Sequence, residues 1–465
     1  MANQQNQSLR RRTAASELIT SGPVWSAVWY LAWPSAVNTL IMTAYNVING
    51  VFVGRLPNGE EALAAVGIGF AALMIQFALT MGIGAGTSAL VSRFIGAEQY
   101  DDADEAAGQS LVLSVLGALL SGIPIIVLAP LIVAWIGAQG SVISLAADYT
   151  AIIAWFSVPR FVYFIAQATL RSTGDVKSPL YAGAATIALN VLLDWLLIFG
   201  IGPFPMLGVR GAAIATGISW VVGMVVSLWF LRRSILRPAF RRMWPHWGWF
   251  ARILNVGWPA ILHNLVWTGA NVVFIKILAF LGPGQATPAQ AALTVGMRIE
   301  SIAFMPGLAY MTAVIPLVGQ NLGAGRPDRA EHCAWVATGQ AIAIMTAVGI
   351  VFFTAPRWLA TLFTTDGAVV PLIVRYLQIN AVSQPFLALG LVLRGALQGA
   401  GETRAPAWIS FVTLWVIRLP LAWVLAIVAG YGAMGSWIAM SGTTILSGLM
   451  ITRWFTWGSW RTMRV

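Results

Sequence analysis

Long apolar stretches recur along the whole chain and are separated by short polar breaks. Ile123–Trp135, Ala182–Ile201 and Ala341–Phe353 lie within three of them, and we find about twelve in all. A helix needs about 20 apolar residues to cross the hydrocarbon core of a bilayer. Barrel strands would alternate apolar and polar residues at period two, and these stretches do not alternate. They therefore predict transmembrane helices, whose backbone groups are all paired within lipid.

Composition agrees with a membrane protein. Of 465 residues, 58% are hydrophobic and 9% are charged, and the mean hydropathy is +0.78. A soluble chain carries about 25% charged residues. A soluble fold of this length could not bury so much apolar surface. We expect an all-α integral membrane protein.

The net charge of +11 at first suggests a nucleic-acid partner, but the distribution of the basic residues follows the expected membrane topology. They gather before the first stretch and in every second loop, at Arg10, Arg11, Arg12, Arg232, Arg233, Arg237, Arg241, Arg242, Arg326, Arg329, Arg404, Arg461 and Arg464. The alternate loops hold little beyond Arg55 and Arg357. Cytoplasmic loops of membrane proteins are enriched in Lys and Arg. The pattern predicts that both termini are cytoplasmic and that nucleic acid is not a partner.

An internal repeat relates the two halves of the chain. Four landmarks recur in the same order, displaced by about 224 to 227 residues: Trp33-Pro34 and Trp258-Pro259, Gly96-Ala97 and Gly323-Ala324, Gly174-Asp175 and Gly401-Glu402, Gly208 and Gly432. Each half holds an even number of stretches, so both halves insert in the same direction. We predict an N-terminal six-helix lobe at 1–231, a basic cytoplasmic linker at 232–252 and a C-terminal six-helix lobe at 253–465. Transporters of this plan bind substrate between their halves.

The sequence carries no sign of catalysis or of nucleotide hydrolysis. The Gly-rich loop followed by Lys and Ser or Thr that cradles phosphates is missing. The single cysteine, Cys333, excludes internal disulfides and Cys-based zinc sites. We expect no enzyme, no cofactor, no ATP and no metal other than a coupling cation. An intramembrane enzyme or a receptor is the rival from another class, and turnover without transport would favour it.

Several segments together resemble the prokaryotic branch of the multidrug and toxic compound extrusion (MATE) family. They are Tyr45-Asn46-Val-Ile-Asn49-Gly-Val-Phe-Val-Gly54, Asn190-Val-Leu-Leu-Asp194, Gly208-Val-Arg-Gly211 and Arg298-Ile-Glu300-Ser-Ile-Ala-Phe-Met-Pro306. The resemblance covers nearly the whole chain. It implies two lobes arranged as a V. It also implies export of organic cations or other amphiphilic drugs by antiport with protons or sodium. We expect the protein to be a monomer in the inner membrane.

The fifth stretch carries the principal candidate for ion coupling, Asp194. Asn190 lies one helical turn earlier, so the two side chains share a face. Burial disfavours the charged form of a carboxyl, so such a group can hold a proton, and its oxygens can also ligate sodium. The resemblance places Asn190 and Asp194 in a cation site, to which Thr216 adds an oxygen. Many relatives have an Asp where this chain has Asn49, and an amide does not titrate.

Glu300 is the candidate for the second half, because a charge inside the membrane is costly and usually functional. It either draws cationic substrate into the cavity or pairs with an arginine, for which Arg375 and Arg418 are the options. Arg298 is two residues away, and residues two apart do not face each other on a helix. We include Arg298 among the residues of the substrate cavity.

Two further residues complete the candidates for the substrate cavity. Tyr45 belongs to the first-helix motif, and His263 lies in the seventh stretch. A lone histidine in a span is usually a hydrogen-bonded core residue, with proton handling as the alternative. A flippase for lipid-linked sugars remains the rival function, since it shares the broad superfamily plan. It should carry many arginines inside its spans to hold phosphate.

Overall fold

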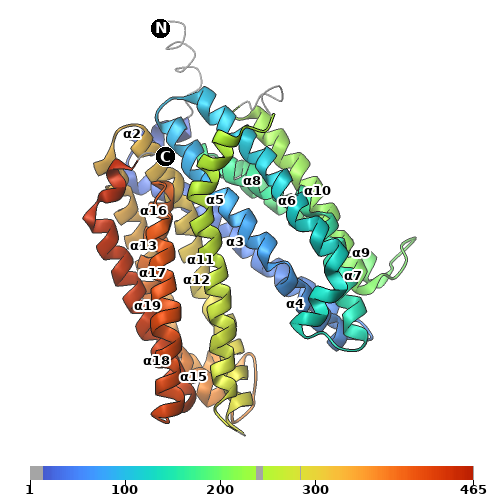
Figure 1. Ribbon diagram of the computed structural model, residues 1–465. Coiled ribbons are helices and arrows are strands. Elements are labelled where there is room, and N and C mark those ends of the chain that lie inside the picture. The colour runs from blue at the N-terminus through green and yellow to red at the C-terminus, as the bar shows by residue number, and fades with distance from the viewer. Residues whose placement is uncertain (1–13, 237–243, 283, 464–465) are drawn as a thin grey trace, which may run out of the picture. The chain divides into compact units, whose positions relative to one another are not determined.

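The computed structural model describes residues 14–236, 244–282 and 284–463, with every side chain except that of residue 46. These residues form helices and connecting turns, and no strand occurs among them (Figure 1). Ten of the helices are long and apolar enough to cross a membrane, or up to twelve spans result if each of two bent pairs counts as one. The prediction of an all-α membrane protein with about twelve spans is confirmed.

The first repeat contains six successive spans. In chain order they are α3 (Val24–Gly54), α4 with α5 (Gly59–Ala72 and Met74–Gly96), α6 (Tyr100–Ile136), α7 with α8 (Ser141–Trp155 and Ser157–Ser172), α9 (Lys177–Phe199) and α10 (Gly208–Arg233). A short helix, α2 (Ala14–Ser21), precedes them. The helices α9 and α10 pack along each other, and α10 also contacts α7 and α8. The fifth span, which carries Asp194, is thereby enclosed on one side.

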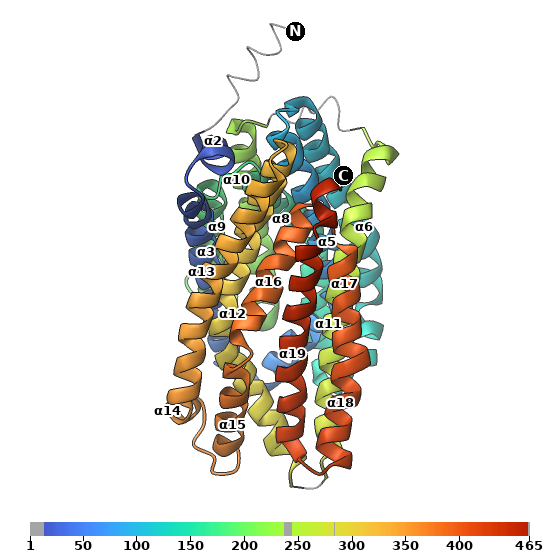
Figure 2. The same ribbon diagram turned by 90° about the vertical axis from the view of Figure 1, so that its left-hand side faces the viewer.

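The second repeat follows the same order. Its spans are α11 (Trp247–Ala279), α12 (Ala286–Gly323), α13 (Pro327–Thr354) with the short α14 (Pro356–Thr361), α15 with α16 (Val370–Ala381 and Gln384–Gly399), the run α17, η2, α18 and η3 (Arg404–Phe411, Val412–Arg418, Leu419–Trp423 and Val424–Val428), and α19 (Gly432–Trp457). The 3₁₀ helix η4 (Ser459–Thr462) ends the described part. In Figure 2, α12, α13, α16 and α19 lie together, and the other three each contact α16.

Contacts divide the chain into two compact units. Unit 1 comprises Val37–Trp258 and the segment that ends at Glu17, and unit 2 comprises Leu18–Ala36 and Pro259–Val465. The first turns of α3 therefore belong to unit 2, and the first turns of α11 belong to unit 1. The predicted lobe limits at 231 and 253 stay a prediction, and residues 237–243 of the predicted linker lie outside the described part of the chain.

The repeat landmarks have the same local structure in both halves. Asp175 Oδ1 accepts hydrogen bonds from the backbone N–H groups of Lys177 and Ser178 at the start of α9. Glu402 Oε1 accepts one from the backbone N–H of Ala405 at the start of α17. A carboxylate there satisfies otherwise unpaired donors and suits the positive end of the helix. The repeated acid found in the sequence is thus a repeated helix cap.

The fourth span of each half is bent at the same position. The angle between α7 and α8 is 54°, and the angle between α15 and α16 is 57°. The breaks fall at Phe156 in the first repeat and just before Gln384 in the second. Seven residues before Phe156 lies Tyr149, and the matching residue of the second repeat is Tyr376. The bends bring these tyrosines close to the two candidate acids described next.

Candidate functional site

The structure joins Asn49 and Asp194, which the sequence singled out on separate helices. Asn49 Nδ2 on α3 donates a hydrogen bond of 3.0 Å to Asp194 Oδ2 on α9. Asp194 is fully buried. A hydrogen bond to a charged group contributes about 1.5–3 kcal/mol, so the amide holds the carboxyl group in place. The bridge shows one way in which the asparagine serves at this position without titrating.

Tyr45 and Thr216 extend this group, although they were predicted for different roles. The Tyr45 hydroxyl lies 3.2 Å from Asn49 Nδ2, which donates to it, and 3.4 Å from Thr216 Oγ1. Thr216 Oγ1 also donates to the carbonyl of Ala212 within α10. Three helices of unit 1, α3, α9 and α10, therefore contribute to one polar cluster, which we call the Asp194 cluster: Tyr45, Asn49, Asn190, Asp194 and Thr216.

Unpaired atoms mark where this cluster could receive a cation. Asp194 Oδ1 is buried and has no hydrogen-bond partner, and the same holds for Asn190 Nδ2. Buried polar atoms are nearly always paired in folded proteins. A proton bound at Asp194 Oδ1 would make the carboxyl group neutral. A sodium ion would instead use this oxygen as a ligand. The roles of Asp194, Asn190, Asn49 and Thr216 in coupling stay a prediction.

Sequence reasoning missed Tyr149, an electrostatic neighbour of Asp194, and Arg160, an electrostatic neighbour of Tyr149. Tyr149 on α7 interacts electrostatically with the Asp194 carboxylate and with Arg160. Arg160 is buried on α8, 5.4 Å above the ring of Trp220 and 5.6 Å from that of Phe161. The repeat offered the only signal for Tyr149, because Tyr376 occupies the matching position of the second half.

In unit 2, Glu300 accepts two hydrogen bonds. The Tyr376 hydroxyl donates one of 2.5 Å, and Gln384 Nε2 donates one of 3.2 Å. Both donors come from the bent pair, Tyr376 from α15 and Gln384 from the first turn of α16. Glu300 therefore ties α12 to the bend of the fourth span in its half.

Of the two arginines considered for Glu300, Arg418 is the one that the structure places in its electrostatic neighbourhood. Arg418 lies at the end of the π-helix η2. It donates to Thr443 Oγ1 at 2.7 Å, to Thr444 Oγ1 at 2.9 Å and to the carbonyl of Met440 at 3.3 Å. Arg375 is exposed on α15, and so is Arg298 on α12. Arg298 therefore points away from the buried partners of Glu300.

His263 has a partner that the sequence did not indicate. Its Nε2 atom lies 2.6 Å from Arg394 Nη1 on α16. A guanidinium group only donates, so Nε2 accepts and the ring is neutral. This pairing leaves His263 poorly suited to carrying a proton. Arg394 lies within the apolar run Leu391–Leu397, so the hydropathy of that segment gave no indication of a charged residue.

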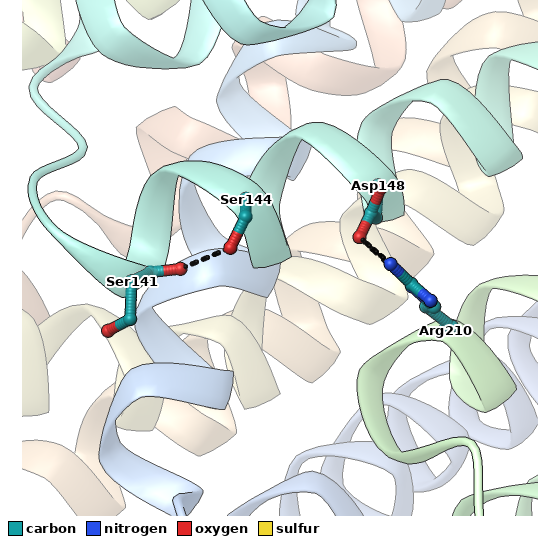
Figure 3. A network of polar contacts seen from close by, with 4 residues as sticks. All are labelled: Ser141, Ser144, Asp148 and Arg210. Carbon is teal, nitrogen blue, oxygen red and sulfur yellow. Dashed lines mark hydrogen bonds and ion pairs between the residues drawn. The ribbon is translucent and has the colours of Figure 1, made fainter.

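Asp148 lies apart from these groups. Arg210 Nε and Nη2 both donate to Asp148 Oδ2, at 2.9 and 2.6 Å, and both side chains are substantially exposed (Figure 3). Exposed ion pairs contribute little, which fits a place near the end of a span. No group of three or more His, Cys, Asp or Glu side chains suited to a metal occurs among the described residues.

Comparison with known proteins places the chain among membrane transporters. The family model described as MatE matches it twice, over residues 34–196 and 259–424. It is 28% identical to a probable multidrug resistance protein NorM of Thermotoga maritima, covering 92% of each chain. It is 30% identical to an FAD transporter of Shewanella oneidensis, covering 93% of this chain and 94% of the relative.

Solved structures agree with this assignment. A crystal structure of MATE in complex with MaD3S matches with a TM-score of 0.88 at 25% identity, covering 96% of this chain and 97% of the other. An outward-facing multidrug resistance MATE transporter of the MOP superfamily matches equally well, with a TM-score of 0.88 and 97% of this chain covered. The two family matches begin at Pro34 and Pro259, the first landmarks of the repeat. The chain belongs to the MatE family, and it is a multi-pass membrane transporter rather than an enzyme.

Proposed function

We propose that this transporter exports amphiphilic, drug-like molecules, organic cations among them, in exchange for a cation that binds at the Asp194 cluster. The observation that carries the proposal is the buried Asp194 carboxyl group, held by Asn49 at 3.0 Å and left with one unpaired oxygen. An antiporter needs a group that binds the ion in one state and releases it in another. The names of the NorM-type relatives support drug efflux as the transport function.

The coupling ion is a proton or sodium. The carboxyl oxygen of Asp194 with the amide of Asn190 and the hydroxyl of Thr216 suits either one. Reconstituted protein in sealed vesicles, with a proton gradient and a sodium gradient imposed separately, tests the proposal. Drug flux driven by one of the two gradients supports it. Flux driven by neither gradient, in vesicles that bind the drug, contradicts antiport.

We further propose an inner-membrane monomer that needs no ATP, with both termini in the cytoplasm. The asymmetry of the basic loops supports this orientation. Single cysteines at Asn58 and at Asp101, in a Cys333→Ala background, should react with an impermeant reagent from opposite sides of the membrane. Both positions are exposed, and Cys333 is buried. Labelling of both from the same side would contradict the orientation.

Export of a flavin dinucleotide is the second candidate, favoured by the 30% identity to the FAD transporter of Shewanella oneidensis. A flippase for lipid-linked sugars is the third. Both substrates carry phosphate groups, whereas many drugs exported by efflux pumps carry a positive charge. Competition between ethidium, a cation, and flavin adenine dinucleotide for transport separates the candidates. Transport of a lipid headgroup across reconstituted vesicles would identify the flippase.

A further inference from the structure

Arg394 of unit 2 lies in the apolar part of its helix and has no acidic partner among the described residues. It lies on α16 between Leu393 and Gly395, and Leu391, Val392, Leu393 and Leu397 around it are all buried. Its Nε atom is buried and makes no hydrogen bond. No ion pair of Arg394 occurs in the part of the chain that the structure describes. A guanidinium group stays charged in proteins, so this positive charge is held among apolar residues.

The one hydrogen-bond partner of Arg394 among the described residues, His263, orients it and leaves its charge uncompensated. His263 Nε2 on α11 accepts a hydrogen bond of 2.6 Å from Nη1. The neutral ring then carries its proton on Nδ1, and that atom is also buried and unpaired. The pair thus presents two donors without acceptors, one on each residue. Buried donors without acceptors are costly, and a buried charge in a span usually marks a functional site.

The first repeat has no such pair at the matching positions. Asn38 stands four residues after Pro34, as His263 does after Pro259. Gln167 stands seven residues before Gly174, as Arg394 does before Gly401. Gln167 is neutral, and both its amide nitrogen and its amide oxygen make hydrogen bonds. Its Nε2 donates to the Pro179 carbonyl and to Ser227 Oγ, and its Oε1 accepts from Arg171. The fold therefore accepts a neutral residue at this position of the helix.

The other charged residues inside unit 2 are already matched to partners. Glu300 accepts from Tyr376 and Gln384. Arg418 donates to two threonine hydroxyls and has the Glu300 carboxylate in its electrostatic neighbourhood. The Nε–H group of the Arg394 cation thus has no acceptor among the described residues. The Nε and Nη donors of a guanidinium group match the two oxygens of a carboxylate or phosphate.

We propose that Arg394, oriented by His263, binds the carboxylate or phosphate group of an amphiphilic substrate. The proposal rests on the proposed transport function and specifies the chemistry that unit 2 recognises. Arg394 contacts the anion, and His263 is a positioning residue that holds one Nη atom. Recognition of an anionic group in unit 2 complements the single acid of the Asp194 cluster in unit 1, which is assigned to the coupling ion.

The test uses purified, detergent-solubilised full-length protein and four fluorescent probes. Ciprofloxacin carries a carboxylate, and its methyl ester presents the same rings without that charge. Flavin adenine dinucleotide carries phosphates, and ethidium is a cation without either group. Arg394→Gln is the main variant, because it installs the residue that the first repeat has at this position. Arg375→Gln, at an exposed arginine of the same unit, is the matched control.

Arg394→Gln should weaken binding of at least one anionic probe about tenfold, the loss expected for one hydrogen bond to a charged group. Its binding of the methyl ester and of ethidium should match that of the parent and of Arg375→Gln. A loss for ciprofloxacin alone identifies a carboxylate site, and a loss for the dinucleotide alone identifies a phosphate site. Arg394→Lys keeps the charge but not the guanidinium edge, so it should recover only part of the affinity.

Histidine variants test the positioning role. His263→Gln keeps an acceptor for Nη1 and should retain the preference for ciprofloxacin over its ester, whereas His263→Leu should lose it. The proposal is overturned if Arg394→Gln lowers acid and ester binding equally, if it changes neither, or if the parent binds no anionic probe. Ethidium transport by the parent in reconstituted vesicles, measured alongside these binding tests, would in these cases leave the proposed efflux function standing. If the parent transported neither ethidium nor any other probe, both the proposed efflux function and the Arg394 site would be contradicted.

Discussion

The two repeats build the same backbone around different polar chemistry. In each, a tyrosine of the bent span packs on a glycine of the second span. A Cβ atom on Gly69 would lie 2.5 Å from the Tyr149 ring, and one on Gly296 would lie 2.5 Å from the Tyr376 ring. Tyr376 donates a hydrogen bond to Glu300 on the second span of its half, whereas Tyr149 interacts electrostatically with Asp194 on the fifth span of its half. Both repeats thus share the packing of tyrosine on glycine, but the acid near the tyrosine lies on the second span in one repeat and on the fifth span in the other.

The charged residue of the fifth span differs even more between the halves. Unit 1 has the buried acid Asp194 there, and unit 2 has the base Arg418. Asn49 bridges to Asp194, while the two threonines of α19 hold Arg418. A symmetric backbone therefore carries one acidic and one basic centre. We infer that duplication supplied the scaffold, and the proposed antiport uses only the copy that holds Asp194.

The largest expected effect is that of Asp194→Asn. Asparagine does not titrate and carries no charge to attract a cation, so gradient-driven efflux should be abolished, while folding and drug binding persist. Efflux from vesicles and drug binding by the purified protein measure the two effects separately. Asp194→Glu should keep part of the activity if protons are exchanged, because a proton site tolerates the added methylene better than a sodium site. Unchanged efflux by Asp194→Asn would contradict the assignment of Asp194 and move the search for the coupling residue to Glu300.

The Glu300→Gln variant tests whether the buried acid of the second repeat attracts cationic substrate. If Glu300 attracts cations, this change should weaken efflux of cationic drugs several-fold more than efflux of neutral ones, since about 1.4 kcal/mol corresponds to a factor of ten. Transport assays with an ethidium-like cation and a neutral drug measure the difference. Equal losses together with poor expression would instead assign Glu300 to the bend, through Tyr376 and Gln384.

Asn49→Asp places a second carboxyl group beside Asp194 and should change the ion dependence of transport. Two carboxyl groups about 3 Å apart titrate as a coupled pair, so the pH or sodium dependence of efflux should shift relative to the parent. Asn49→Ala serves as the control, since it removes the bridge without adding a charge. An ion dependence identical in the parent and Asn49→Asp would show that residue 49 does not take part in coupling.

The smallest effect concerns the loop after the second span. Glu98 and Gly325 occupy matching positions, with φ of 61° and 70°. A residue with a Cβ atom pays about 1–2 kcal/mol in this left-handed region, which glycine avoids. Gly325→Ala should therefore lower the thermal unfolding temperature by a few degrees, as monitored by fluorescence-detected gel filtration. Glu98→Gly should not lower it; a clear loss of stability there would mean that the side chain of Glu98 outweighs the backbone strain.

The sequence predicted the features that one chain segment encodes alone. Helical spans follow from apolar runs, and the repeat follows from glycines and capping acids such as Asp175 and Glu402, whose roles are local. The Asp194 cluster was also partly predicted, because Asn190 and Asp194 share one helix face. Partners on different helices were not. The electrostatic interaction of Tyr149 with Asp194 and the hydrogen bond of Arg394 with His263 depend on how each helix is rotated and bent, which hydropathy does not encode.

The measurement that tests the central claim most directly is the movement of the counter-ion itself. Vesicles with trapped pH and sodium indicators would receive drug from outside, and the ion flux that accompanies drug transport would be recorded for the parent, Asp194→Asn and Glu300→Gln. The account predicts flux of one cation in the parent and in Glu300→Gln, and none in Asp194→Asn. Coupled flux that persists in Asp194→Asn and disappears in Glu300→Gln would contradict it.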